Sequence, residues 1–116
     1  MKVLYLAGKY RDVRGTWYVE QNIQAARKIA VELWQMGYAV ICPHANTAFF
    51  EGPLNDQQII DGDLELVKRC DGVVMLPGWE TSEGAIFEHR IALEAKKPIF
   101  TCSISDKELL ISWVNK

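Results

Sequence analysis

The sequence predicts an α/β fold: one small doubly wound domain, flavodoxin-like or Rossmann-like, with a parallel sheet of four to five strands and helices on both faces. Short apolar runs alternate with longer segments of helical periodicity, and this alternation favours a parallel sheet with right-handed crossovers. The chain has 116 residues, of which 49% are hydrophobic and 24% charged. These values suit a single globular domain over residues 1–116 with a substantial core.

The first predicted element is an apolar strand over residues 2–7. Gly8 follows at once, at a point where the backbone must turn tightly or approach a ligand closely. Lys9, Arg11 and Arg14 come next. Three cations after a first strand suit an anionic substrate group, which Arg can grip with two hydrogen bonds. A solvated basic loop explains the same charges equally well.

A long helix is predicted over residues 16–36, capped by Thr16 and ended by Gly37, followed by a strand over 38–42. Residues 43–53 then form a long loop for so small a domain, and such loops are often functional. The loop leaves the carboxyl end of the second strand. His44 and Asn46 could therefore touch substrate, although a structural histidine is at least as good an interpretation.

The next predicted helix is capped by Asn55 or Asp56 and runs to residue 69. Its apolar residues recur at helical spacing. Asp63 lies one turn after Ile59, at the edge of this apolar face. It is a candidate site carboxylate, although a surface aspartate is the simpler explanation from the residues alone.

Residues 73–76 form a short apolar run that predicts a fully buried strand, ended by Pro77 and Gly78. Thr81 or Ser82 can then cap a helix over residues 84–96. Its amino terminus would favour an anion at the carboxyl edge of the sheet.

Glu88 is the unusual residue of this helix. A helical wheel groups the small and apolar residues in one stripe, with Glu88 in its middle: Gly84, Ala85, Ile91, Ala92 and Ala95. A carboxylate there is unfavourable unless another group pairs with it. Gly84, one turn earlier, leaves room for a ligand. A glutamate that reaches solvent from the edge of the stripe is the alternative.

A strand over residues 97–102 and a short amphipathic helix over 106–114 complete the prediction. The most apolar strands, the first and third, should be central, which gives the strand order 2-1-3-4. The switch point between them would bring the Gly8 loop and the 78–82 loop to one crevice. Neither a dinucleotide-binding glycine motif nor a P-loop is present.

Composition narrows the possible functions. The net charge of −2 argues against a general binder of nucleic acid polymers. Cys42, Cys70 and Cys102 have no metal-like spacing and predict free thiols in a reducing compartment such as the cytoplasm. No apolar run is long enough to span a membrane, and no signal peptide is expected. His44 and His89 lie too far from any thiol pair to suggest a metal site, and no cofactor is expected.

Three motifs, taken together, carry a resemblance to a known superfamily. They are Tyr5-Leu6-Ala7-Gly8-x-x-Arg11, Asp63-Leu64 with Asp71 before a Val-Val strand, and Ser82-x-Gly84-x-x-x-Glu88. Over nearly the whole chain this pattern resembles the nucleoside 2-deoxyribosyltransferase superfamily, and its layout is most similar to the 2′-deoxynucleoside 5′-phosphate N-hydrolases. Residues 43–47 and 76–80 are similar to DUF4406, a small family of that superfamily.

The resemblance implies a role for each matching residue. Glu88 would be the nucleophile that attacks C1′ of the sugar, and Tyr5 would orient it. Asp63 would bind the sugar and help to protonate the leaving base. The phosphate grip would comprise Arg11, Ser82 and the Gly8 backbone.

Other positions match the superfamily less well. Ser112 lies at about the offset of a serine that, in the hydrolases, reaches the neighbouring subunit's site. Lys9 stands where those hydrolases carry Ser. Trp79, after Gly78, has no counterpart and could stack on a base or serve a subunit contact.

The expected function is therefore an N-glycosidase that acts on nucleosides or (deoxy)nucleoside 5′-monophosphates, or a related transferase that exchanges the base. The alternative is a non-catalytic nucleotide-binding module of the same fold. A third possibility is a structural partner protein that uses Trp17, Trp34 and Trp113 as contacts. Ile86 and Leu93, on a second side of the Glu88 helix, predict a homo-oligomer of two or more chains.

Overall fold

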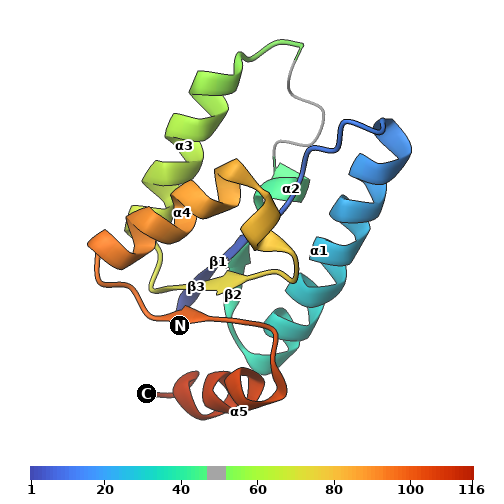
Figure 1. The fold of residues 1–116 in the computed structure, drawn as a ribbon. Helices are drawn as coiled ribbons and strands as arrows, with labels where there is room; N and C mark the ends of the chain where they lie inside the picture. The colour runs from blue at the N-terminus through green and yellow to red at the C-terminus, as the bar shows by residue number, and fades with distance from the viewer. Residues whose placement is uncertain (47–51) are drawn as a thin grey trace.

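The computed structural model describes residues 1–46 and 52–116. Its centre is a four-stranded parallel sheet with the order β2-β1-β3-β4 (Figure 1). The strands are β1 (Val3–Ala7), β2 (Ala39–Ile41), β3 (Gly72–Met75) and β4 (Ile99–Phe100). The predicted strand order and the small doubly wound α/β fold are confirmed.

Helices cover both faces of this sheet (Figure 1). Helices α1 (Thr16–Met36) and α5 (Ile104–Trp113) contribute to one core cluster, and α3 (Asp56–Arg69) and α4 (Glu83–Glu94) to the other. Two short helices, α2 (Pro43–Asn46) and η1 (Trp79–Thr81), follow β2 and β3. None of the helices within the described ranges is long and apolar enough to cross a membrane.

Side chains of the central strands point alternately into the two cores, one on each face of the sheet. Leu4, Leu6 and Val74 pack toward α1 and α5, whereas Tyr5 and Val73 pack toward α3 and α4. This period of two is the geometry of a strand buried on both faces. Tyr5 therefore points to the face on which α4 lies, and that orientation positions the site described below.

Several element boundaries differ from the sequence-based expectations. Strand β4 has two residues instead of six, because only Ile99 and Phe100 pair with β3. Helix α1 begins at Thr16 after Gly15, without a side-chain cap. The expected loop over residues 43–53 begins instead with α2, and its residues 47–51 lie outside the described ranges.

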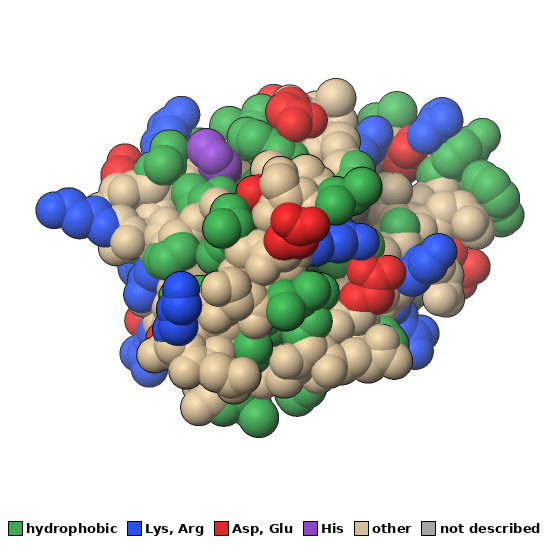
Figure 2. Space-filling model, turned by 90° about the horizontal axis from the view of Figure 1, so that it is seen from below, with side chains coloured by type: hydrophobic (Ala, Val, Ile, Leu, Met, Phe, Trp, Pro, Cys, Tyr) green, Lys and Arg blue, Asp and Glu red, His purple; other side chains and the backbone are tan. Residues whose placement is uncertain are grey.

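The last helix, α5, differs most from the amphipathic helix expected over residues 106–114. It begins at Ile104, because the Ser103 hydroxyl caps it by accepting the backbone N–H of Asp106 at 3.1 Å. It is not amphipathic: Leu110 is buried, but Leu109 and Ile111 on either side are exposed. Figure 2, which views the molecule from the end where α5 lies in Figure 1, shows apolar side chains in several places between charged ones.

The two central strands approach each other closely where they end. The backbone N–H of Leu76 donates to the carbonyl of Ala7 at 2.7 Å. A Cβ atom added to Gly8 would lie 2.5 Å from Leu76 Cδ1, so a larger residue there would displace Leu76. Glycine thus lets the two loops that follow β1 and β3 leave the sheet side by side.

Candidate active site

A cavity of about 670 Å³ lies between α3, α4 and the segment after β1. It combines apolar side chains of α3 with carboxyl groups from α3 and α4. The residues singled out from the sequence that line it are Gly8, Lys9, Arg11, His44, Asp63, Ser82, Gly84 and Glu88. A second hollow of about 570 Å³, beside α1 and β2, has no carboxylate among its lining residues.

Tyr5 and Glu88 form a direct hydrogen bond between β1 and α4. The Tyr5 hydroxyl donates to Oε2 of Glu88. Tyr5 is fully buried, and burial, together with the neighbouring charges of Glu88 and Asp63, holds the pKa of its phenol well above the ordinary value. It therefore keeps its proton across the physiological range and acts as a fixed donor to the carboxylate.

Two of the carboxyl groups that line the cavity, those of Glu88 and Asp63, have a pKa above their ordinary range. Burial raises the pKa of Glu88 to about 8; the Tyr5 hydrogen bond opposes this rise and the charge of Asp63 adds to it. Burial raises the pKa of Asp63 to about 6. Two perturbed carboxyl groups in one cavity are typical of acid–base sites. In the described part of the chain, no group of three His, Cys, Asp or Glu residues could hold a metal ion.

The first turn of α4 forms another wall of the cavity. Ser82 caps the helix, with its hydroxyl accepting the N–H of Ala85 at 3.3 Å. A Cβ atom added to Gly84 would meet nothing closer than the Ser82 hydroxyl, at 4.0 Å. This open space lies one turn before Glu88, so a ligand can approach the helix backbone there.

The basic segment after β1 is paired with carboxylates. Lys9 Nζ lies 3.6 Å from Asp12, and an Arg14 Nη2 atom lies 2.7 Å from the same carboxylate. Arg11 donates to both carboxyl oxygens of Asp56, with Nη1 at 3.0 Å from Oδ2. Lys9 and Arg11, but not Arg14, line the cavity.

His44 is a buried residue that holds the segment after β1. Its Nε2 lies 2.8 Å from the carbonyl of Lys9, and its ring meets Tyr10 edge-on at 5.7 Å. Burial lowers the pKa of this histidine, so it is neutral near pH 7. It borders the cavity as part of its wall. The side chain of Asn46 lies outside what the structure describes.

Tyr5 reaches Glu88 from the core and does not line the cavity itself; of the other expected site residues whose side chains the structure describes, three do not line it either. Gly78 begins η1 with a φ of 83°, a left-handed conformation that favours glycine. Trp79 stacks on His89, with ring centroids 4.5 Å apart. Ser112 is exposed on α5. Their roles in binding remain predictions, and Ser112 would need a second chain to reach a site.

Several cavity residues were not singled out from the sequence as site residues. Asp56 was considered only as a helix cap, and Phe87 lines the cavity although it is 52% exposed. Ile59, Ile60 and Leu64 were assigned to the apolar face of α3, and they line the cavity as well. The apolar face of α3 carries more apolar residues than the core covers, because only Val67 of this helix is fully buried. The number of apolar residues on that face was therefore the signal in the sequence that it also lines a cavity.

The raised pKa of Glu88 predicts a pH-dependent stability. The folded pKa of about 8 exceeds the ordinary 4.5, so the folded state holds a proton that the unfolded state releases, and stability falls as pH rises from about 4.5 to about 8. Asp63, with its folded pKa of about 6, contributes to the lower part of this fall. We expect Glu88→Gln to reduce the fall and to stabilise the protein at pH 8 by about 2 kcal/mol, which is less than the full pKa shift implies because solvent partly screens Glu88.

Urea unfolding at pH 5 and pH 8 measures this effect. Glu94→Gln, on the exposed surface of the same helix, is the matched control and should keep the wild-type pH dependence. An equal loss of stability between the two pH values in wild type and Glu88→Gln would contradict the prediction.

A model of the family described as "Domain of unknown function (DUF4406)" matches residues 2–101 of this chain. No curated protein matches the chain in sequence. Solved structures do match in fold. The CMP N-glycosidase of Clostridium botulinum aligns with a TM-score of 0.60 at 23% identity, over 86% of this chain and 67% of that chain.

Two other solved structures are similar to a comparable degree. The 2-deoxyribosyltransferase of Leishmania mexicana has a TM-score of 0.61 at 18% identity, over 87% of this chain and 63% of its own. That of Bacillus psychrosaccharolyticus has a TM-score of 0.59 at 19% identity, over 85% of this chain and 70% of its own. At these identities the likeness shows a shared fold.

Proposed function

The chain belongs to the DUF4406 family, and from this premise we propose that it cleaves the N-glycosidic bond of nucleosides or (deoxy)nucleoside 5′-monophosphates, with Glu88 as the nucleophile. The observation that carries the proposal is the hydrogen bond from buried Tyr5 to Glu88 at a cavity that also contains Asp63. The activities named for the structural neighbours, an N-glycosidase and two deoxyribosyltransferases, support it.

In the proposed reaction, ionised Glu88 forms a bond to C1′ as the bond from C1′ to the base nitrogen breaks. The electron pair of that bond leaves with the base, which takes a proton from Asp63. The pKa of about 6 suits Asp63 to this role, because a group that titrates near the working pH gives and takes protons readily. Tyr5 keeps the attacking carboxylate oriented and favours its ionised form.

The glycosyl–Glu88 ester can then react in two ways. Water that gives a proton to ionised Asp63 attacks C1′ and regenerates Glu88, which completes hydrolysis. Attack on C1′ by the nitrogen of a second base breaks the ester bond to Glu88, passes the N–H proton of that base to ionised Asp63 and completes an exchange instead. Either reaction uses the same three residues, so both belong to the proposal.

A non-catalytic nucleotide-binding module is the second candidate. The observation in its favour is the pKa of about 8 at Glu88, which leaves about nine tenths of this group protonated at pH 7 in the empty site. A protonated Glu88 would donate a hydrogen bond to a sugar hydroxyl instead of attacking carbon. Under this alternative a bound nucleoside stays intact.

Incubation of pure protein with ribo- and deoxyribonucleosides and their 5′-monophosphates tests the proposal, with free base measured by chromatography. Release of base from at least one compound, lost in Glu88→Ala, supports the glycosidase. A second base added to the reaction tests for exchange. Binding by thermal shift without release from any compound would replace the proposed reaction with the binding module.

We also propose a homo-oligomer of two or more chains. Large apolar side chains are exposed on α1 and α4, namely Trp17, Trp34, Ile86, Phe87 and Leu93. Phe87 adjoins the cavity, so a contact there would help to enclose it. We expect a sedimentation mass of at least two chains at micromolar concentration, and the mass of one chain would contradict this.

We also propose that the protein works in a reducing compartment such as the cytoplasm. Cys70 and Cys102 form no disulfide bond. Free cysteines persist in reducing compartments, of which the cytoplasm is the most common.

A further inference from the structure

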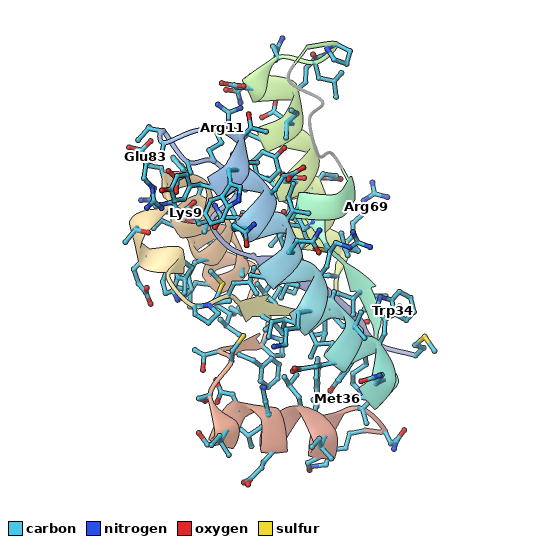
Figure 3. All side chains as sticks on the ribbon, turned by 90° about the vertical axis from the view of Figure 1, so that its right-hand side faces the viewer. Lys9, Arg11, Trp34, Met36, Arg69 and Glu83 are labelled. Carbon is cyan, nitrogen blue, oxygen red and sulfur yellow. The ribbon has the colours of Figure 1, made fainter. Side chains whose placement is uncertain are left out.

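The charges around the cavity are unbalanced toward the acidic side. The carboxyl groups that line it are those of Asp56, Asp63, Glu83 and Glu88. Among the described residues, Lys9 and Arg11 are the only Lys or Arg side chains that line it. Figure 3 draws Lys9, Arg11 and Glu83 on one side of the molecule. A phosphate bound in this cavity would have to meet one of these two cations.

Both cations already have carboxylate partners. Arg11 uses two guanidinium nitrogens on the two oxygens of Asp56, which is the geometry that a phosphate would need from it. Lys9 lies 3.6 Å from Asp12. A 5′-phosphate would therefore displace Asp56 from Arg11 and then lie close to that carboxylate.

Asp56 is held where it is by the start of its own helix. It is the first residue of α3, directly after the cap Asn55. Asn55 Oδ1 accepts the N–H of Gln58 at 2.8 Å, and Gln58 Oε1 accepts the N–H of Asn55 at 3.1 Å. This reciprocal capping box fixes the backbone at Asp56, and from there its exposed carboxylate reaches the exposed guanidinium of Arg11.

The other positive features of the cavity are also engaged. The amino terminus of α4 carries Glu83 in its first turn, and its Ala85 N–H is bonded to Ser82. His44 is buried with Nε2 on the Lys9 carbonyl, and burial favours its neutral form. Neither feature offers a phosphate a charge comparable to that of Arg11.

We propose that Asp56 sets the 5′ specificity of this site: by holding the guanidinium of Arg11, it makes the cavity prefer a nucleoside, with its uncharged 5′-hydroxyl, over the corresponding 5′-monophosphate. This inference rests on the proposed function for the identity of the ligand. It narrows that function to nucleosides and contrasts with the phosphate grip that the sequence resemblance implies for Arg11.

Calorimetric titration at low ionic strength tests the proposal, with nucleosides of adenine, guanine, cytosine and thymine and their 5′-monophosphates. Glu88→Gln serves as the parent protein so that no ligand is consumed. We expect the parent to bind a nucleoside more tightly than its monophosphate. Asp56→Asn should raise monophosphate affinity about tenfold and change nucleoside affinity less than about threefold, because it removes the carboxylate that holds Arg11 and with it a negative charge of the cavity.

Two further variants separate this effect from a general change in charge. Adding Arg11→Gln to Asp56→Asn should abolish the gain in monophosphate affinity. Asp61→Asn removes the same charge from the same helix, at a residue bonded to Gln57 that does not line the cavity, and should leave the preference unchanged. Thermal melting checks that each variant is folded.

A parent that binds any monophosphate more tightly than its nucleoside would overturn the proposal, as would an Asp56→Asn variant without the gain. Nucleoside binding without base release by the wild type would end the proposed reaction and leave this specificity standing. Binding of neither member of any pair would overturn both.

Discussion

Glu88→Gln is expected to lower the rate of base release by at least about 10⁴-fold, because the amide cannot form the glycosyl ester on which the reaction depends. The substitution keeps the size of the side chain and an oxygen that can accept the Tyr5 hydroxyl. Nucleoside binding should therefore change by less than about threefold. A loss confined to turnover distinguishes a nucleophile from a residue that only shapes the cavity.

Single-turnover assays with excess enzyme measure this loss, and Glu94→Gln on the same helix should retain the wild-type rate. A nucleoside with fluorine at C2′ adds a second readout, since fluorine slows breakdown of the ester. Mass spectrometry should find the sugar on the peptide that contains Glu88. A Glu88→Gln protein that keeps more than a tenth of the wild-type rate would refute the nucleophile assignment.

The second large effect is expected in the pH profile. The reactive form needs Glu88 ionised and Asp63 protonated, although the pKa of Glu88, about 8, lies above that of Asp63, about 6. The profile of kcat/KM should therefore be bell-shaped, with limbs near pH 6 and pH 8. Outside these limbs the rate should fall about tenfold per pH unit. The two midpoints belong to the interacting pair.

Asp63→Asn should change the shape of this profile as well as its height. Without a titrating acid the alkaline limb disappears. The remaining acid limb then reports the ionisation of Glu88 alone. It should move up from pH 6 but stay below pH 8, because the charge of Asp63 contributes to the raised pKa of Glu88. Rates from pH 4.5 to 10 on a nucleoside that does not titrate in this range test it. An unchanged bell in Asp63→Asn, or a wild-type profile with one limb, would contradict the assignment.

The sequence was sufficient to predict the sheet order and the buried orientation of the central strands. Uninterrupted apolar runs at residues 3–7 and 73–76 indicate central strands, because a strand that is buried on both faces needs apolar residues at every position. The position of Glu88 in its helical stripe likewise indicated a buried carboxylate. Its partner is Tyr5, which lies 83 residues away. That pairing could be drawn only from a resemblance, since local periodicity carries no information on it.

The wrong boundaries have a local cause. Ser103, which caps α5, and Thr16, which does not cap α1, are both plausible cap residues. Only the backbone geometry distinguishes them. The pairing of Arg11 with Asp56 was missed for another reason. A charged side chain can pair with any opposite charge nearby, and the sequence alone does not tell that α3 lies beside the segment after β1.

The burial of Tyr5 in a central strand has a consequence for how this protein can diversify. Tyr5, which donates to Glu88 and would orient it in the proposed reaction, is also a fully buried member of the core. A substitution of Tyr5 would therefore be selected against for two reasons, loss of stability and loss of the proposed activity. Variant libraries aimed at new ligands should leave β1 unchanged and randomise the solvent-facing rim of the cavity, where Lys9, Ile60 and Phe87 can vary without disturbing the core.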